Sequence, residues 1–207
     1  MKLSKQKIFL IIIISFAFLI GCSRNKSYIE DYEYGLLYTS NSGSVVSLYD
    51  KQGENLGEKN LNVSGITFGS FMKNGIEVKD KLYYAAPLAG SNQQDFVVEM
   101  DKDKLSVSKI KSTGVTPTFF SSDGKYTFSG ISSLNNSQII KTDIEKNKVI
   151  GTNELEGQGI NMIEDGNQLY ILSINHNDSG KSTSGNLYTI DKSSFKVLNK
   201  IVVEDIS

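Results

Sequence analysis

Residues 123–143, DGKYTFSGISSLNNSQIIKTD, hold the elements that decide the fold. The stretch opens with Asp123-Gly124, the strongest short hairpin signal, because a type I′ turn requires positive φ at both central positions. An apolar and aromatic segment follows at 125–128, and a second segment at 139–143 ends in aspartate after a polar loop. We expect an antiparallel pair of strands here, entered through a tight turn.

The same order of elements recurs along the chain. Tyrosines of the first segment type lie at positions 38, 83, 126 and 170, spaced by 45, 43 and 44 residues. The second segment type ends each time in an aspartate: Asp50, Asp101, Asp143 and Asp191. A short charged turn and a further strand follow, clearest at 105–107, 148–150 and 197–202. The period of about 44 residues indicates a repeat architecture.

Four short antiparallel strands in each repeat are typical of a propeller blade. No part of the chain after residue 21 shows the 3.6-residue period of an amphipathic helix. Over about residues 34–203 the chain resembles the bacterial extracytoplasmic β-propellers of the WD-like and YVTN-like class. The resemblance implies an all-β propeller of about four four-stranded blades. The chain lacks the Trp-Asp signature of WD repeats and the tryptophans of quinone-cofactor propellers. A β-sandwich with coincidental spacing is the alternative.

The repeats divide residues 34–207 into blades at about 34–70, 71–114, 115–157 and 158–207. The first blade begins at its second strand, and residues 28–32 are too polar to be a good innermost strand. The last blade ends with an outermost strand, so no strand is left to close the ring. We therefore expect either a truncated reading frame or an oligomer that completes the ring.

The N-terminal segment is typical of a secretory signal. Three lysines precede an apolar run at residues 8–20, which is shorter than the roughly 20 residues of a transmembrane helix. Leu19-Ile20-Gly21-Cys22 resembles the lipobox of bacterial lipoproteins. The resemblance implies that the signal peptide, 1–21, is removed, that Cys22 carries a diacylglycerol, and that 22–33 is a tether. An uncleaved anchor and a plain secretory signal are the alternatives. The expected location is the extracytoplasmic face of the cell membrane.

Charge and cysteine content exclude several classes of function. Loss of residues 1–21 removes three lysines, so the net charge goes from −1 to −4. An acidic chain is poorly suited to nucleic acid, which we exclude as a partner. Cys22 is the only cysteine, and its acylation leaves no thiol for a disulfide, a catalytic thiolate or a metal ligand.

The longest predicted loop, Asn175 to Asn186, holds the only histidine, His176. It belongs to a set of polar, nearly uncharged loops that we expect at one end of the blades. Its candidate ligand-facing residues are Asn175, His176, Asn177, Asp178 and Ser182. The chain has no G-x-S-x-G elbow, Gly180-Lys181-Ser182 lacks the rest of a phosphate-binding loop, and Asn186 stands where a calcium loop needs glutamate. We predict no catalytic residue, no metal and no cofactor.

These features favour a lipid-anchored propeller that binds or scaffolds a partner in the cell envelope, either a protein or a cell-wall glycan. A hydrolase or lactonase-like enzyme with its site in the propeller channel is the alternative. An acidic or metal-binding cluster in that channel would favour the enzyme.

Overall fold

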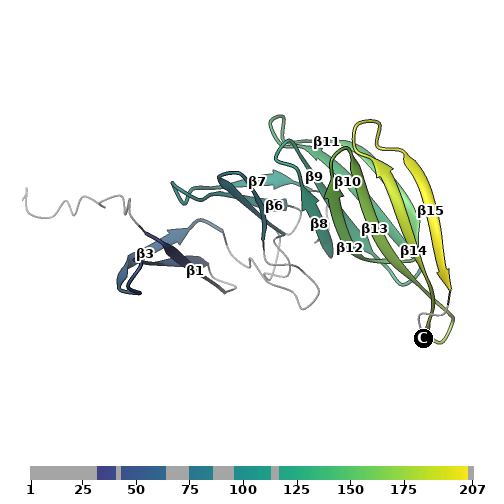
Figure 1. The fold of residues 1–207 in the computed structure, drawn as a ribbon, viewed down its shortest axis with the longest axis horizontal. Coiled ribbons are helices and arrows are strands. Elements are labelled where there is room, and N and C mark those ends of the chain that lie inside the picture. The colour runs from purple at the N-terminus through teal and green to yellow at the C-terminus, as the bar shows by residue number, and fades with distance from the viewer. Residues whose placement is uncertain (1–31, 41–42, 64–74, 86–95, 113–116, 205–207) are drawn as a thin grey trace, which may run out of the picture.

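The computed structural model describes residues 32–40, 43–63, 75–85, 96–112 and 117–204. Within these ranges the chain is all-β and forms four antiparallel sheets, which we call blades 1 to 4. The blades follow one another in chain order along the long axis of the molecule (Figure 1). Cys22, most of the tether and the loop at 87–94 lie outside the described residues.

The strands of each blade are consecutive in sequence, and each pairs with its neighbours as in a meander. Blade 1 contains β1 (Tyr34–Thr39), β2 (Ser44–Tyr49) and β3 (Asn55–Leu61). Blade 2 contains β4 (Ile76–Val78), β5 (Lys81–Ala85), β6 (Phe96–Asp101) and β7 (Val107–Lys111). Blade 3 contains β8 (Phe119–Ser122), β9 (Tyr126–Ser132), β10 (Asn136–Asp143) and β11 (Lys148–Glu156). Blade 4 contains β12 (Gln158–Asp165), β13 (Gln168–His176), β14 (Ser182–Asp191) and β15 (Val197–Glu204).

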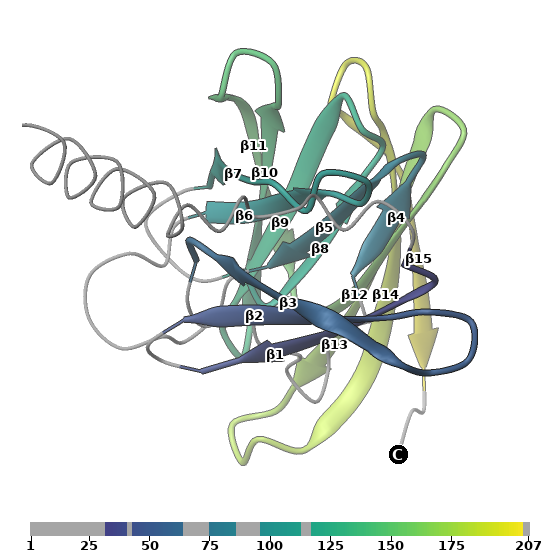
Figure 2. The same cartoon turned by 90° about the vertical axis from the view of Figure 1, so that its left-hand side faces the viewer.

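Blade 1 has three strands in the described part of the chain, and β1 corresponds to the second strand of the other blades. This agrees with the sequence-based expectation that the first repeat starts at its second strand. Figure 2 looks along the row of blades from the blade 1 side, and the strands of blade 1 cross those of blade 4 behind them at an angle.

Apolar side chains fill the contacts between neighbouring blades. Successive residues of a strand point to opposite faces, so a blade with neighbours on both sides needs apolar residues at every position. In β6, Phe96, Val98 and Met100 join the cluster with blade 1, while Val97 joins the cluster with blade 3. The largest cluster lies between blades 3 and 4 and includes Phe128.

The aspartate at or directly after the end of β2, β6, β10 and β14, the strand before the outermost one in each blade, has a structural role. Its Oδ1 accepts a backbone N–H of the following turn: Gln52 on Asp50 at 2.9 Å, Lys104 on Asp101 at 2.8 Å, Lys146 on Asp143 at 2.9 Å and Ser194 on Asp191 at 2.6 Å. Aspartate side chains commonly stabilise turns in this way. The repeated aspartate is therefore explained by the turn that it stabilises.

The predicted type I′ geometry of the Asp-Gly turns is wrong. Gly124 and Gly166 have positive φ, but Asp123 and Asp165 do not. Asp165 is the last residue of β12 and pairs with Gln168, so Gly166 and Asn167 are the two turn residues. A positive φ at the first turn position alone is the type II′ pattern, in which glycine is preferred.

Candidate functional site

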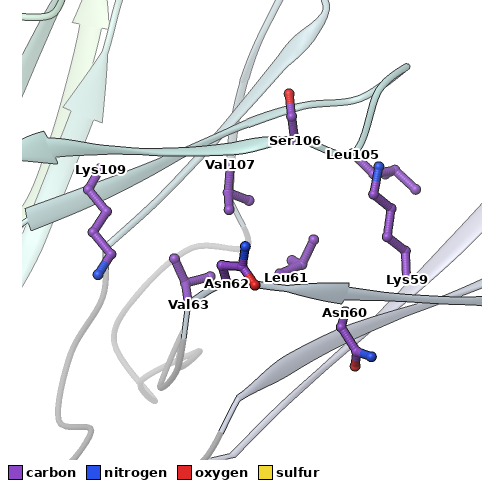
Figure 3. A pocket seen from close by; sticks show the side chains of 9 residues that line it. All are labelled: Lys59, Asn60, Leu61, Asn62, Val63, Leu105, Ser106, Val107 and Lys109. Carbon is purple, nitrogen blue, oxygen red and sulfur yellow. The ribbon is translucent and has the colours of Figure 1, made fainter.

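A cleft of about 280 Å³ lies between the outermost strands of blades 1 and 2. Strands β3 and β7 form its two sides, and Figure 3 shows the side chains that line it. Buried Leu61, Val63 and Leu105, with half-buried Val107, give it an aliphatic floor. The lining also includes Lys59, Asn60, Asn62, Ser106 and Lys109.

The two lysines lie at opposite ends of this cleft (Figure 3). Lys59 pairs with Val46, and Lys109 pairs with Val98. Both valines belong to the cluster between blades 1 and 2, so the two lysine side chains lie on the sheet faces that border the cleft. The Lys59 Nζ donates to the Lys104 carbonyl oxygen, and the Lys109 Nζ lies 4.6 Å from the centre of the Phe96 ring. The described lining holds two cations and no carboxylate.

The segment that we predicted as the longest loop is mainly a hairpin. Strand β13 extends to His176 and β14 starts at Ser182, which pairs with His176. Only residues 177–181 form the turn, so the prediction of a loop over 175–186 is wrong. A continuous polar stretch is typical of a loop, but here most of it forms the paired ends of two strands.

The polar side chains of this hairpin bond mostly to one another. Asn175 donates to Ser184 Oγ at 2.8 Å, and its Oδ1 accepts from Asn186 Nδ2 at 3.0 Å. The Asn177 Oδ1 accepts the backbone N–H of Lys181 at 2.9 Å. His176 Nε2 lies 2.9 Å from Gln158 Oε1. Asn175, Asn177 and His176 therefore hold the hairpin in shape, while Asp178 is exposed at its turn. Their assignment as ligand-facing residues stays a prediction.

The charged residues at the opposite end of the blades also pair among themselves. Lys192 is buried, and its Nζ bonds to Glu164 of blade 4 and to Asp123 of blade 3, the latter at 3.1 Å. Burial opposes the charge of Lys192, but the hydrogen bonds to these two carboxylates raise its pKa. This ion-paired group joins two blades, and we assign it a structural role.

A second buried cation strengthens the same seam between blades 3 and 4. The Lys141 Nζ donates to the carbonyl oxygens of Lys192 and Ser193, the latter at 3.3 Å. It also lies 4.1 Å from the centre of the Tyr126 ring. Sequence reasoning missed Lys141, because nothing in its neighbourhood distinguishes it from an exposed strand lysine.

In blade 2 the buried carboxylate of Glu99 bonds to two side chains, of which Tyr83 is buried and Lys81 is partly exposed. Lys81 Nζ lies 2.5 Å from Glu99 Oε1, and the Tyr83 hydroxyl donates to Glu99 Oε2 at 3.0 Å. Burial raises the pKa of Tyr83, and the bond to Glu99 raises it further. Among the described residues, no group of three or more His, Cys, Asp and Glu side chains is arranged to hold a metal ion. The described segments include no helix long and apolar enough to cross a membrane.

No protein-family model matches the sequence, and no curated protein matches it. Solved structures do match. The dihydro-heme d1 dehydrogenase NirN, solved in complex with DHE, is 16% identical with a TM-score of 0.54, over 86% of this chain and 38% of that one. The Dos1 propeller is 13% identical with a TM-score of 0.53, over 86% of this chain and 52% of that one. The chain thus spans less than two thirds of the length of these structures. At such identities the similarity shows the fold alone: the described chain forms four blades of a β-propeller.

Proposed function

We propose that this chain is a lipid-anchored, extracytoplasmic binding module that holds a partner protein of the cell envelope. The signal-like segment and Cys22 support the anchor, which would keep the propeller close to the membrane. The hydrolase alternative has no supporting cluster of His, Cys, Asp and Glu side chains among the described residues. The observation that carries the binding module is the cleft between β3 and β7.

The lining of the cleft favours a peptide segment over a glycan. Its floor is aliphatic, and no aromatic side chain is among the residues that line it. A lysine at each end attracts an anionic partner, and Asn62 and Ser106 offer hydrogen bonds between them. The matching partner is an extended segment in which acidic residues flank one or two aliphatic ones. Such a segment also suits the neighbouring sheet edges, where an extended peptide is able to add as a strand.

Binding of a fluorescein-labelled peptide of alternating glutamate and leucine to the full chain in detergent tests this proposal. Replacing both cleft lysines, Lys59→Gln with Lys109→Gln, should weaken binding by about three- to tenfold, since an exposed charge pair contributes about 0.2–1 kcal/mol. The loss should shrink as salt is added, because salt screens exposed charges. Anisotropy titrations at two salt concentrations give both values.

Lys51→Gln with Lys148→Gln is the matched control, because both lysines are exposed and lie outside the cleft. This control removes the same charge and should leave the affinity within about twofold of the original. An equal loss in both double variants would show general attraction to an acidic peptide and would contradict a site in the cleft.

The anchor has its own test. With Cys22→Ala, the acyl chains have no attachment point, and the protein should leave the membrane fraction or remain unprocessed. Fractionation followed by mass spectrometry of the N-terminal peptide measures both outcomes. A correctly cleaved variant that stays in the membrane fraction would refute the lipid anchor and leave the cleft proposal intact.

A further inference from the structure

Within the described residues, the first and last blades each expose large apolar side chains on the face that points away from the neighbouring blade. Val46 and Leu48 of blade 1 pack against blade 2, while on its opposite face Tyr34, Leu36 and Tyr38 are 50–56% exposed. Apart from the Glu58 carboxylate, the rows across this face carry no charged side chain. An apolar sheet face of this kind resembles a blade contact whose other half is missing.

Blade 4 has a corresponding face on the other end of the row. Met162, Ile171 and Tyr188 pack against blade 3. The alternate positions form rows across the sheet, and three of these rows contain no charged side chain: Ile163, Tyr170, Thr189 and Asn199; Asn161, Leu172, Leu187 and Ile201; and Gln158, Ile174, Gly185 and Val203. The next row, toward the turns, contains Asp165, Gln168 and Asp191. Ile163, Leu172, Ile201 and Val203 are 38–50% exposed. Exposed apolar side chains that gather on one face of a sheet are typical of an interaction site.

Strand pairing shows which positions these exposed residues occupy. The aspartate at or directly after the end of β2, β6, β10 or β14 gives each blade a common reference position. Residues at the same number of positions before this aspartate are equivalent between blades, and so are their partners on the preceding strand. Two residues before the aspartate, the partners are Tyr83 in blade 2, Phe128 in blade 3 and Tyr170 in blade 4. Tyr83 and Phe128 are buried against the next blade, whereas no blade among the described residues packs on Tyr170, which is half-buried.

Counting three residues before the aspartate, instead of two, identifies the face of blade 1 that points away from blade 2. Three residues before the aspartate, the partners include Leu36 in blade 1 and Ile171 in blade 4. Ile171 is fully buried against blade 3, and Leu36 is half-exposed. Leu36 and Tyr170 therefore occupy the two sides of an ordinary blade-to-blade contact, one at each end of the same chain.

We propose that blade 4 of one copy packs against blade 1 of a second copy, and that two such contacts close a ring of eight blades. Propellers typically contain four to eight blades, and the described chain has four. The chain also spans 52% of the Dos1 propeller, so two copies match one ring of that length. A head-to-tail contact that occurs twice about a twofold axis is closed, which prevents growth into filaments.

The mass of the full chain in detergent, measured by light scattering with the detergent subtracted, tests the proposal. We expect twice the mass of one chain. Leu36→Asp on blade 1 and Ile201→Asp on blade 4 should each weaken the dimer by about a hundredfold, because a buried charge disrupts both contacts of the ring. Leu134→Asp is the control: Leu134 is 58% exposed in the turn between β9 and β10, and the substitution should leave the dimer intact.

A 1:1 mixture of the two variants distinguishes the modes of pairing. Each mixed pair keeps one unaltered contact, between blade 4 of the Leu36→Asp chain and blade 1 of the Ile201→Asp chain, so dimers should reappear. A dimer that only one of the two substitutions breaks would show like-with-like pairing and overturn the proposal. A wild-type chain that stays monomeric at high micromolar concentration, or grows into larger species, would also overturn it.

Hydrogen exchange of the wild-type chain provides evidence that does not depend on the variants folding. Dilution below the dissociation constant should speed exchange in β1, where the open edge and the proposed interface coincide, and in β13 to β15. The amides of β9 and β10, inside the row of blades, should exchange at the same rate at both concentrations. Unchanged exchange in β1 and β13 to β15 across a dilution that halves the mass would contradict the proposed surfaces.

Discussion

Replacing Lys192 by methionine should destabilise the seam between blades 3 and 4. The side chain is 10% exposed and bonds to Asp123 and Glu164, whose side chains are 17% and 29% exposed. Methionine keeps the apolar stem but removes the cation, leaving two carboxylates close together without the cation that they share. Breaking a fully buried pair costs about 3–5 kcal/mol. Because water reaches both carboxylates, we expect a loss nearer to 2 kcal/mol.

Urea unfolding followed by circular dichroism measures this loss. With a slope of about 2 kcal/mol per molar urea, the midpoint should fall by about 1 M. Lys146→Met is the matched control, because Lys146 is 70% exposed and lies 3.2 Å from Asp143 in a surface pair. We expect that control to change the free energy of unfolding by less than about 0.5 kcal/mol.

Removing the two carboxylates and raising the pH both test the role of Lys192. Adding Asp123→Asn and Glu164→Gln to Lys192→Met removes the unpaired charges and should restore most of the stability. Because the pKa of Lys192 is raised on folding, its contribution is complete below its unfolded pKa of about 10.4 and disappears as pH rises through the folded value. The difference between wild type and variant should therefore narrow above about pH 10.4. A Lys192→Met variant as stable as Lys146→Met, or a triple variant less stable than Lys192→Met, would refute the account.

Other consequences of the fold can be measured in the same way. A methyl group added at Gly159 would lie closer than 3.0 Å to the Phe119 ring, so Gly159→Ala should cost about 1–3 kcal/mol in urea unfolding, whereas Gly43→Ala, with open space around it, should cost little. Backbone and side-chain donors of Ser194 lower the pKa of Asp191, so its contribution to stability is complete above its unfolded pKa and is lost as pH falls through the lower folded value. Asp191→Asn should consequently flatten the acid limb of a stability-against-pH curve, and an unchanged acid limb would contradict this.

The sequence predicted the fold class and the order of strands, because both depend on local patterns. Apolar and aromatic segments separated by turns were sufficient to identify the second and third strands of each repeat and the fourth strands of blades 3 and 4. In blade 2 the fourth strand was expected at 105–107, whereas β7 begins at Val107 and Leu105 lies in the preceding turn. The first strands were harder to see. β4 has three residues and β8 is a short Phe-Phe-Ser-Ser segment, too brief to show alternation.

The register of the repeat was not accessible from spacing. The tyrosines at 38, 83, 126 and 170 recur every 44 residues or so, but their cross-strand partners lie five, two, zero and two residues before the aspartate. Loop lengths vary between blades and shift the aspartates relative to the tyrosines. Equivalent positions in different blades are defined by the pairing of their strands. The turn aspartate marks these positions better than the tyrosine does, because its side chain accepts a backbone N–H of the following turn in every blade.

The candidate site was predictable only in part, since it depends on which residues of two neighbouring blades lie next to each other. Lys59 and Lys109 are 50 residues apart, and only the packing of β3 beside β7 places them around one cleft. Conversely, the polar, nearly uncharged stretch at 175–186 suggested a binding loop, but its amides and hydroxyls bond to one another across β13 and β14. A polar sequence does not distinguish groups that are satisfied internally from groups available to a ligand.

The position of the cleft has an energetic consequence for a molecule built from blades. In a repeat protein the free energy of unfolding is approximately the sum of the stability of each repeat and of the contacts between neighbouring repeats. A ligand that binds across two blades therefore stabilises the contact between them. The seam between blades 3 and 4 already has a large apolar cluster and the buried cations Lys141 and Lys192. In the described part of the chain, blade 1 packs against blade 2 alone, so its attachment there depends on the contact that contains the cleft. A peptide held between β3 and β7 would therefore fix blade 1 in place and, with it, Leu36 on the opposite face. Binding in the cleft and closure of the ring should then favour each other, with each increasing the affinity of the other by the same factor.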